Sequence, residues 1–185
     1  MNKAFVVAIP EEVNNSKEIN GIPVFYSGLG KLNAMSTTLK LISEGFNEII
    51  NIGSCGSTNL EPGKIIKIGK CFEDIDATPI FEYGKTSNDE LGFIEIDKNS
   101  EFSCFTTDYF FYHDEILKYS QNYIRMVNQC SVLDMECYSH AKICELYKVK
   151  FSSYKWVSDD GDYNSWIENC KIGFNNFLDN FSTTL

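Results

Sequence analysis

Arginine is almost absent from this chain of 185 residues: of the 16 basic residues, only Arg125 is an arginine. Acidic residues number 26, so the formal net charge at pH 7 is −10. Because proteins bind the phosphates of nucleic acids mainly through lysine and arginine, this balance argues against a nucleic-acid partner. A small uncharged ligand remains compatible with it.

Paired cysteine motifs are also missing. The seven cysteines include no CxxC pair, and the two histidines, His113 and His140, do not complete a set of zinc ligands. Several of the cysteines lie within apolar runs, where cysteine behaves as a small buried hydrophobe. We therefore expect reduced thiols, a cytoplasmic location, and neither a metal ion nor a cofactor.

Long hydrophobic runs are absent as well. No apolar run reaches the length of a membrane-spanning helix, and the run in MNKAFVVAIPEEV is too short for a signal peptide. What is present is a hydrophobic share of 43% and an aromatic share of 14%, which are typical of a folded globular protein. No repeat or linker divides the sequence, so we expect one domain over residues 1–185 and no membrane partner.

Apolar runs alternate with turn residues in a pattern that predicts an α/β fold. A short strand near 93–96 is expected inside an irregular connection over 80–101. Polar or glycine-rich clusters follow nearly every strand, which favours a mixed sheet covered by helices with one site-bearing edge. The other expected strands cover 3–9, 22–26, 48–52, 64–73 and 102–106, and the expected helices cover 32–44, 113–128 and 166–181.

The segment Val132–Asp162 predicts a β-α-β unit. An apolar run ends in the letters DME, a helical pattern follows, and a strand over 149–157 ends in SDDGD. Such crossovers join parallel strands, so Glu136 and Asp159 are expected at the ligand-binding edge of the sheet. An aspartate after a strand also often caps a helix, and these residues alone leave that alternative open.

Two glycine clusters follow expected strands and predict turns whose backbone amides approach a ligand. They are Gly28-Leu29-Gly30-Lys31 and Gly53-Ser54-Cys55-Gly56. Neither has the spacing of a Walker sequence or the full G-x-G-x-x-G pattern, so a simple tight turn is the alternative for each. Acidic residues after a strand, such as Glu11 and Glu12, also favour the first turn of a helix.

Seven motifs stand in order along the chain: AIPEEV, SGLGKLNA, NIGSCGS, EDIDAT, TTDYFF, DMEC and WVSDDGD. In this order they resemble the nucleoside phosphorylase superfamily and, within it, the methylthioadenosine/S-adenosylhomocysteine nucleosidases. Members carry a glutamate before a valine after the first strand, G-[IL]-G-K, N-x-G-S-x-G, D-x-D-x-T, a phenylalanine-bearing loop, M-E and S-D-x-x-D. The resemblance spans Ala8 to Asp162 and implies a single-domain mixed β-sheet flanked by helices, of the nucleoside phosphorylase type.

The resemblance also implies roles for individual residues. Glu12, rather than Glu11, matches the carboxylate that activates the attacking water, and Asp159 matches the acid that protonates purine N7. Glu136 matches the carboxylate that binds the ribose hydroxyls. A departing purine needs that proton while a carboxylate stabilises the cationic sugar, so the carboxyl groups must differ in protonation. The other matches bind substrate: Ser54 near the water and ribose, Met135 against the sugar, Phe110 on the base with Phe111 beside it, Ser158 holding the acid, and Leu29 in the turn that faces the ribose.

The scarcity of arginine indicates whether water or phosphate attacks the sugar. Phosphorylases of the superfamily hold phosphate with arginines, including one just before the G-[ST]-x-G turn, where this chain has Ile49-Ile50-Asn51-Ile52. Arginine suits phosphate because its charged planar fork binds two oxygens. We therefore expect hydrolysis of the N-glycosidic bond of an adenine nucleoside such as methylthioadenosine or adenosylhomocysteine. The alternatives are an aminodeoxyfutalosine-type substrate, a phosphate-dependent purine nucleoside phosphorylase, and a catalytically silent nucleoside-binding relative.

Two departures from the family pattern lie in or beside these motifs. Asp134 precedes M-E where relatives usually carry glutamate, and Lys155 replaces an arginine common in the strand before S-D. The chain is also shorter around 14–21 and 80–101, and in the family the second region helps complete the pocket, often from a neighbouring subunit. The resemblance implies a homodimer acting in methionine salvage and purine nucleoside metabolism, and it leaves the 5′-substituent of the substrate open.

Overall fold

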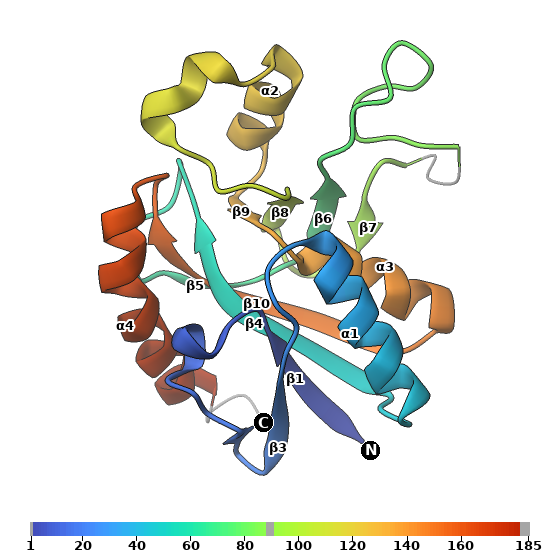
Figure 1. Cartoon of the computed structure of the whole chain (residues 1–185), viewed down its shortest axis with the longest axis vertical. Helices are drawn as coiled ribbons and strands as arrows, with labels where there is room; N and C mark the ends of the chain where they lie inside the picture. The colour runs from blue at the N-terminus through green and yellow to red at the C-terminus, as the bar shows by residue number, and fades with distance from the viewer. Residues whose placement is uncertain (1, 88–90, 182–185) are drawn as a thin grey trace.

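The computed structural model describes residues 2–87 and 91–181 (Figure 1). The helices are α1 (Lys31–Ser43), α2 (Gln121–Gln129), α3 (Cys137–Tyr147) and α4 (Tyr163–Phe181), with two 3₁₀ helices, η1 (Pro10–Val13) and η2 (His113–Lys118). The strands are β1 (Lys3–Val7), β2 (Glu18–Ile19), β3 (Ile22–Tyr26), β4 (Glu48–Gly56), β5 (Ile65–Lys67), β6 (Lys70–Glu73), β7 (Ile94–Glu95), β8 (Ser103–Thr106), β9 (Val132–Asp134) and β10 (Lys150–Asp159).

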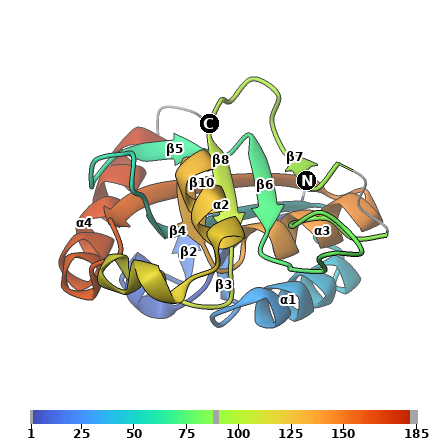
Figure 2. The ribbon, with the colours of Figure 1, turned by 90° about the horizontal axis from the view of Figure 1, so that it is seen from above.

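These strands form one mixed sheet in the order β2-β3-β1-β4-β9-β8-β6-β7, and β10 pairs with both β4 and β5. Strand β4 is central, because β1 and β10 both pair with it in parallel. Helices α1 and α3 pack together on one side of the sheet, and α4 packs against β10 on the other (Figures 1 and 2). The arrangement confirms the predicted mixed sheet flanked by helices.

The core beneath α4 fixes the central strands. Trp156 in β10 is fully buried and packs against Phe174 and Phe177 of α4. A Cβ atom at Gly173 would lie only 2.1 Å from Cδ1 of Trp156, so the indole ring needs a glycine at this point of the helix. Each fully buried aromatic or aliphatic side chain here contributes about 1.5–3 kcal/mol to folding. This packing holds the ends of β4 and β10 in place.

Two predicted elements are each divided in the structure. The expected strand over 64–73 is two strands, because Gly69 passes so close to the turn at 97–100 that a Cβ atom would lie 2.1 Å from Ser100 O. Strand β5 then pairs with β10 and β6 pairs with β8. The expected helix over 113–128 is η2 followed by α2, and the Ser120 side chain caps α2 by accepting from Tyr123 N.

The prediction that the strands of the β-α-β unit run parallel is wrong. Strand β10 pairs with β4 in parallel, whereas β9 pairs with β4 in the antiparallel sense, between Leu133 and Gly56. The two strands are therefore not parallel neighbours, because β4 lies between them in the pairing. The ends of β9 and β10 still meet near Gly56, at the end of β4.

All seven cysteines are buried, and none forms a disulfide. Over residues 2–87 and 91–181, no helix combines the length and the apolar character that crossing a membrane requires.

Candidate active site

A pocket of about 460 Å³ lies where several strands end. Its lining comes from residues that end or follow β1, β3, β4, β8, β9 and β10, together with the first turn of α4. This volume is within the range of small-molecule sites. Most of the predicted site residues line it: Glu12, Leu29, Ser54, Phe110, Phe111, Met135, Glu136 and Asp159. The remaining one, Ser158, is buried directly beside Asp159.

Glu12 is buried in η1, and its carboxylate lies against β4. Oε1 accepts hydrogen bonds from Ser54 N at 2.8 Å and from Ser54 Oγ at 2.6 Å. Oε2 has only a long contact of 3.5 Å from Ile9 N, so it keeps acceptor capacity toward the pocket. Burial raises the pKa of Glu12, although the Ser54 hydrogen bonds and the charge of Lys155 act in the opposite direction. The carboxylate therefore depends on Ser54 for its ionised form.

Asp159 ends β10 and is also buried. Its Oδ2 accepts from Ser158 Oγ at 2.7 Å, and its Oδ1 accepts from Gly161 N at 2.9 Å. Burial is the largest influence and raises the pKa of Asp159 above its ordinary value, against the lowering effect of these two hydrogen bonds. A carboxyl group that keeps its proton to higher pH is suited to act as a general acid.

Glu136 stands at the start of α3, where the sheet meets the GLGK segment. Its Oε1 accepts from Gly30 N at 2.9 Å. Burial, followed by the charge of Asp134, raises the pKa of Glu136 to about 8. Gly30 has φ of +91°, in the left-handed region that favours glycine, and this conformation aims its amide at the carboxyl group. The second glycine of GLGK therefore positions Glu136.

The cluster Gly53-Ser54-Cys55-Gly56 is not the turn that the sequence predicted. It lies inside β4, and it pairs with β10 as far as Gly56 and Asp159. A Cβ atom at Gly53 would lie 3.1 Å from Glu12 Oε1, and one at Gly56 would lie 3.2 Å from Asp159 Oδ1. The two glycines thus leave room for two carboxylates on one strand, a close approach that is one common reason for glycine within a strand.

Aromatic side chains form one wall of the pocket. Phe110 lies against Tyr112 and edge-on to Tyr163 of α4. Phe111 is more deeply buried, and a Cβ atom at Gly161 would lie 3.0 Å from its Cδ1. The segment after β8 therefore packs directly on the loop that follows Asp159. Such a wall can stack on a planar base.

Sequence reasoning missed Trp166. This half-buried residue lies in the first turns of α4, lines the pocket, and donates from Nε1 to Ser54 Oγ at 3.0 Å. The only available signal was an aromatic residue shortly after SDDGD, and the sequence predicted it only as the first residue of the helix over 166–181. The helix begins at Tyr163, earlier than predicted, and Asp162 accepts from Ser165 N in its first turn.

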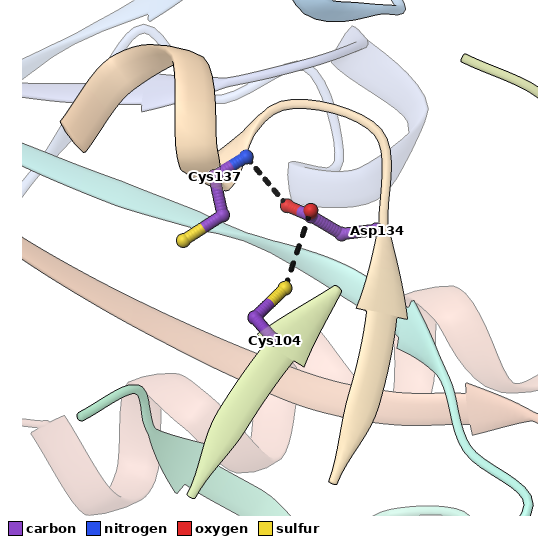
Figure 3. A group of neighbouring side chains, drawn as sticks. All are labelled: Cys104, Asp134 and Cys137. Atoms are coloured by element: carbon purple, nitrogen blue, oxygen red, sulfur yellow. Dashed lines mark hydrogen bonds between the residues drawn. The ribbon is translucent and has the colours of Figure 1, made fainter. Parts of the chain in front are cut away.

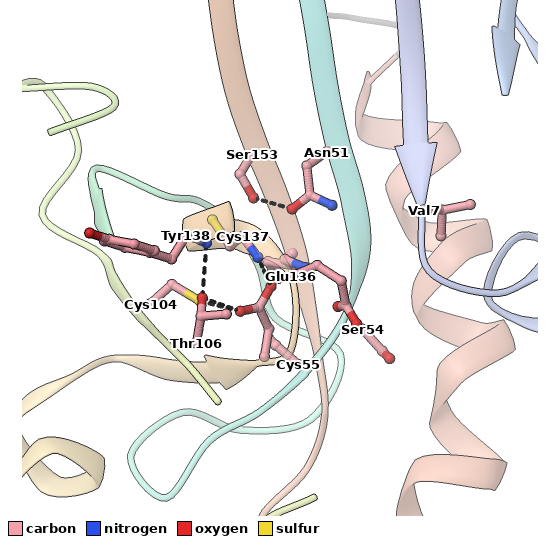
Figure 4. A network of polar contacts seen from close by, with 12 residues as sticks. Val7, Asn51, Ser54, Cys55, Cys104, Thr106, Glu136, Cys137, Tyr138 and Ser153 are labelled. Carbon is pink, nitrogen blue, oxygen red and sulfur yellow. Dashed lines mark hydrogen bonds and ion pairs between the residues drawn. The ribbon is translucent and has the colours of Figure 1, made fainter. Parts of the chain in front are cut away.

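Asp134 and Lys155, the two positions that depart from the family pattern, form a buried ion pair at 2.7 Å. Asp134 also accepts from Cys137 N, the first residue of α3, and from Cys104 Sγ (Figure 3). Thr106 Oγ1 donates to Asp134 and accepts from Tyr138 N, close to Glu136 (Figure 4). The two departures are therefore partners, and their network fixes the start of α3, where Glu136 lies.

Three side chains place atoms that could bind a metal ion within 4.8 Å of one another: those of Cys104, Asp134 and Cys137. Both oxygens of Asp134 are already occupied by Lys155, Thr106 and the other donors of the network. Since the Lys155 ammonium occupies the cation position beside this carboxylate, these side chains suit an ion pair better than a metal ion.

The sheet and the helices on its two sides define the nucleoside phosphorylase fold. The structure is similar to futalosine hydrolase of Helicobacter pylori strain 26695, with a TM-score of 0.82 and 17% identity over 98% of this chain and 95% of that one. It is also similar to 5′-methylthioadenosine/S-adenosylhomocysteine nucleosidase of Helicobacter pylori bound to butyl-thio-DADMe-Immucillin-A. There the TM-score is 0.80 and the identity is 18% over 99% of this chain and 97% of that one.

The sequence comparison goes beyond the fold. The model of the phosphorylase superfamily matches residues 17–179, and the chain therefore belongs to the phosphorylase superfamily. A 5′-methylthioadenosine/S-adenosylhomocysteine nucleosidase of Buchnera aphidicola subsp. Schizaphis graminum (strain Sg) is 34% identical to it over 156 residues. That match covers 75% of this chain and 66% of the relative's own length.

Proposed function

We propose that this protein hydrolyses the N-glycosidic bond of an adenine nucleoside of the methylthioadenosine or adenosylhomocysteine type. Glu12 activates the attacking water, Asp159 protonates the purine, and Glu136 binds the ribose hydroxyls. The 34% identical relative, a nucleosidase by its name, supports this substrate class. Phe110 stacks on the base with Phe111 beside it. The remaining contacts to substrate come from Ser54, Met135 and Leu29, while Ser158 holds the acid.

The proposed reaction breaks the bond between C1′ and N9 and leaves its electron pair on the purine. Asp159 donates a proton to N7, so the purine departs neutral. The free Oε2 of Glu12 accepts a proton from water, whose oxygen forms the new bond to C1′. Solvent then restores the proton of Asp159 and removes the one on Glu12. The positive charge that builds on the sugar is stabilised by the ionised Glu12 carboxylate beside it.

The observation that carries the choice of water is the charge of the lining. Among the described residues that line the pocket there are five acids and no lysine, arginine or histidine. Arg125 is exposed on α2 outside the lining, and the Lys155 ammonium is engaged by Asp134. Inorganic phosphate would have to enter this acidic pocket without a cation to bind it, whereas neutral water meets no such barrier.

Adenine release without phosphate is the expected result that tests this function. Methylthioadenosine, adenosylhomocysteine and aminodeoxyfutalosine would each be incubated with the protein in phosphate-free buffer and in phosphate buffer, and the products separated by chromatography. We expect free adenine and the free 5′-substituted ribose at the same rate in both buffers. Adenine that appears only with phosphate, together with a ribose 1-phosphate, would identify a phosphorylase. No turnover of any nucleoside that binds would favour a silent relative.

Asp159→Asn is expected to lower kcat by about 10²–10⁴-fold with little change in KM. The asparagine can still accept from Gly161 N but has no proton to give to N7. Because the pKa of Asp159 is raised, wild-type kcat should fall as pH rises through that pKa, and this alkaline limb should disappear in the variant. Steady-state kinetics over a pH series measure both effects.

Asp160→Asn is the matched control, since Asp160 is exposed beside Asp159. Its kcat below the alkaline limb should stay close to the wild-type value, and the limb should be retained but lie at lower pH, because the charge of Asp160 contributes to the raised pKa of Asp159. A wild-type rate in Asp159→Asn would instead show that another group supplies the proton.

A further inference from the structure

Trp166 is linked to Glu12, the proposed water-activating residue, through hydrogen bonds of the Ser54 hydroxyl. Its indole ring lines the pocket and stacks on Tyr163, with 5.7 Å between ring centroids. Nε1 lies 3.0 Å from Ser54 Oγ, and Ser54 Oγ lies 2.6 Å from Glu12 Oε1. A single line of hydrogen bonds therefore runs from α4, through β4, to the carboxylate in η1.

The direction of this line follows from which groups can donate. An indole N–H is a donor only, so Trp166 must give its hydrogen to a lone pair of Ser54 Oγ. The hydroxyl has one proton of its own, and Glu12 Oε1 is the acceptor at 2.6 Å. The backbone N–H of Ser54 donates to the same oxygen. Both donors from Ser54 thus converge on Oε1.

This direction favours the ionised form of Glu12. A neutral carboxyl group that carried its proton on Oε1 would meet the Ser54 hydroxyl proton and the Ser54 amide proton. Successive hydrogen bonds in one direction also polarise one another, which strengthens the final bond to the carboxylate. The effect opposes the burial that raises the pKa of Glu12. It leaves Oε2 as the oxygen available to water.

We infer that Trp166 is a positioning residue for hydrolysis: its indole N–H fixes the Ser54 hydroxyl as a donor to Glu12 and so keeps that carboxylate ionised, with Oε2 free for the attacking water. The inference rests on the proposed function of Glu12. It adds a residue of α4, outside every motif that carries the family resemblance, to the water-activating half of the site. Helix α4 therefore contributes to the chemistry as well as to the core.

Other ionisable groups also act on Glu12, and the test must hold them constant. Lys155 of β10 lowers the pKa of Glu12, and the charges of Glu12 and Glu136 disfavour each other. The surrounding groups that remain in every variant below are Lys155 and Asp159 of β10, Glu136 before α3, Asp134 of β9, and the thiols of Cys55 in β4 and Cys170 in α4.

The test replaces Trp166 by phenylalanine, which removes the N–H and keeps an aromatic ring. A second variant carries 3-benzothienylalanine, which keeps the shape of indole but has sulfur in place of the N–H, so it guards against a folding defect in the first. The pH midpoint for ionisation of the Glu12 carboxyl group, called the Glu12 midpoint below, would be measured by ¹³C NMR of protein labelled at the glutamate carboxyl carbons. The Glu12 signal would be assigned by its absence in Glu12→Gln. This readout requires no turnover.

Loss of one hydrogen bond in the line is expected to raise the Glu12 midpoint by roughly half a unit to one unit in both variants. Glu12 must be ionised to act as the base. In the pH profile of kcat/KM for methylthioadenosine, the acidic limb should therefore move to higher pH by the same amount. The rate above that limb should fall by about threefold to tenfold, since Oε1 is held less firmly. KM should change little, because Trp166 acts through Ser54.

The Ser54→Ala background decides whether the effect passes through Ser54. There, removal of the Trp166 N–H should produce no further shift of the Glu12 midpoint or of the acidic limb. An unchanged midpoint in both Trp166 variants, or an equal shift with and without Ser54, would overturn the inference. If the wild-type protein released no adenine, the proposed function would fail, while the NMR midpoints would still report whether Trp166 controls the ionisation of Glu12.

Discussion

Glu12→Gln is expected to reduce hydrolysis of methylthioadenosine by at least about 10³-fold while nucleoside binding stays close to wild type. Glutamine has nearly the same shape, and its oxygen can still accept both hydrogen bonds from Ser54. The amide cannot take a proton from water, so the loss falls on the chemical step. Adenine release measures kcat, and isothermal titration calorimetry with a non-hydrolysable analogue of methylthioadenosine measures Kd, because the active enzymes would consume the nucleoside itself.

The neighbouring glutamate is a matched control for this change. Glu11 is exposed in the same turn of η1, whereas Glu12 is buried against β4. Glu11→Gln alters the overall charge by the same amount and should leave kcat and Kd near wild type. Normal turnover in Glu12→Gln would remove Glu12 from the mechanism, and equal losses in both variants would point to a general effect of charge.

Lys155→Met is expected to lower the free energy of unfolding by about 3–5 kcal/mol, the cost of leaving one member of a buried ion pair without its partner. Methionine fills most of the space of lysine but leaves the Asp134 carboxylate buried without a counter-charge. Urea unfolding, followed by circular dichroism, measures the change. Because Asp134 also holds the start of α3, the variant should lose activity along with stability.

A second substitution separates charge from packing at this pair. In Asp134→Asn/Lys155→Met no uncompensated charge remains, and the asparagine oxygen can still accept from Cys137 N, so the double variant should be more stable than Lys155→Met alone. Lys40→Met, which removes a lysine from an exposed pair with Glu44, should change the free energy of unfolding by less than about 0.5 kcal/mol. A double variant no more stable than Lys155→Met would show that packing, rather than charge, decides the cost.

The pairing of Asp134 with Lys155 gives a physical reason for two departures from the family pattern. On the sequence they stand 21 positions apart and look unrelated. In the fold they form one contact beneath Glu136, so a shorter acid and a lysine occur together where the family usually has glutamate and arginine. The departures therefore concern an ion pair at the edge of the pocket that holds the start of α3, and Glu12, Glu136 and Asp159 are all present in the lining.

Much of the candidate site could be predicted from the sequence because its residues lie in motifs near the ends of apolar runs, and the family resemblance of those motifs implied their roles. Glu12, Ser54, Glu136 and Asp159 each stand at or just after an apolar run, and the structure brings them to one pocket. Reasoning from strand direction was less successful. Strand β9 is short and meets β4 through a single antiparallel pair, a detail that no pattern of apolar residues encodes.

The sequence by itself determined the fold class and the order of the motifs, because these depend on local periodicity and residue type. The family resemblance carried by those motifs implied the residues expected to carry the chemistry. Only the tertiary structure decided how the residues work together. It placed Gly53 and Gly56 under two carboxylates, paired Asp134 with Lys155, and brought Trp166 to Ser54 from a distance of 112 positions along the chain. Such contacts depend on how strands and helices pack across the sheet, and a linear pattern carries no record of which side chains that packing brings together.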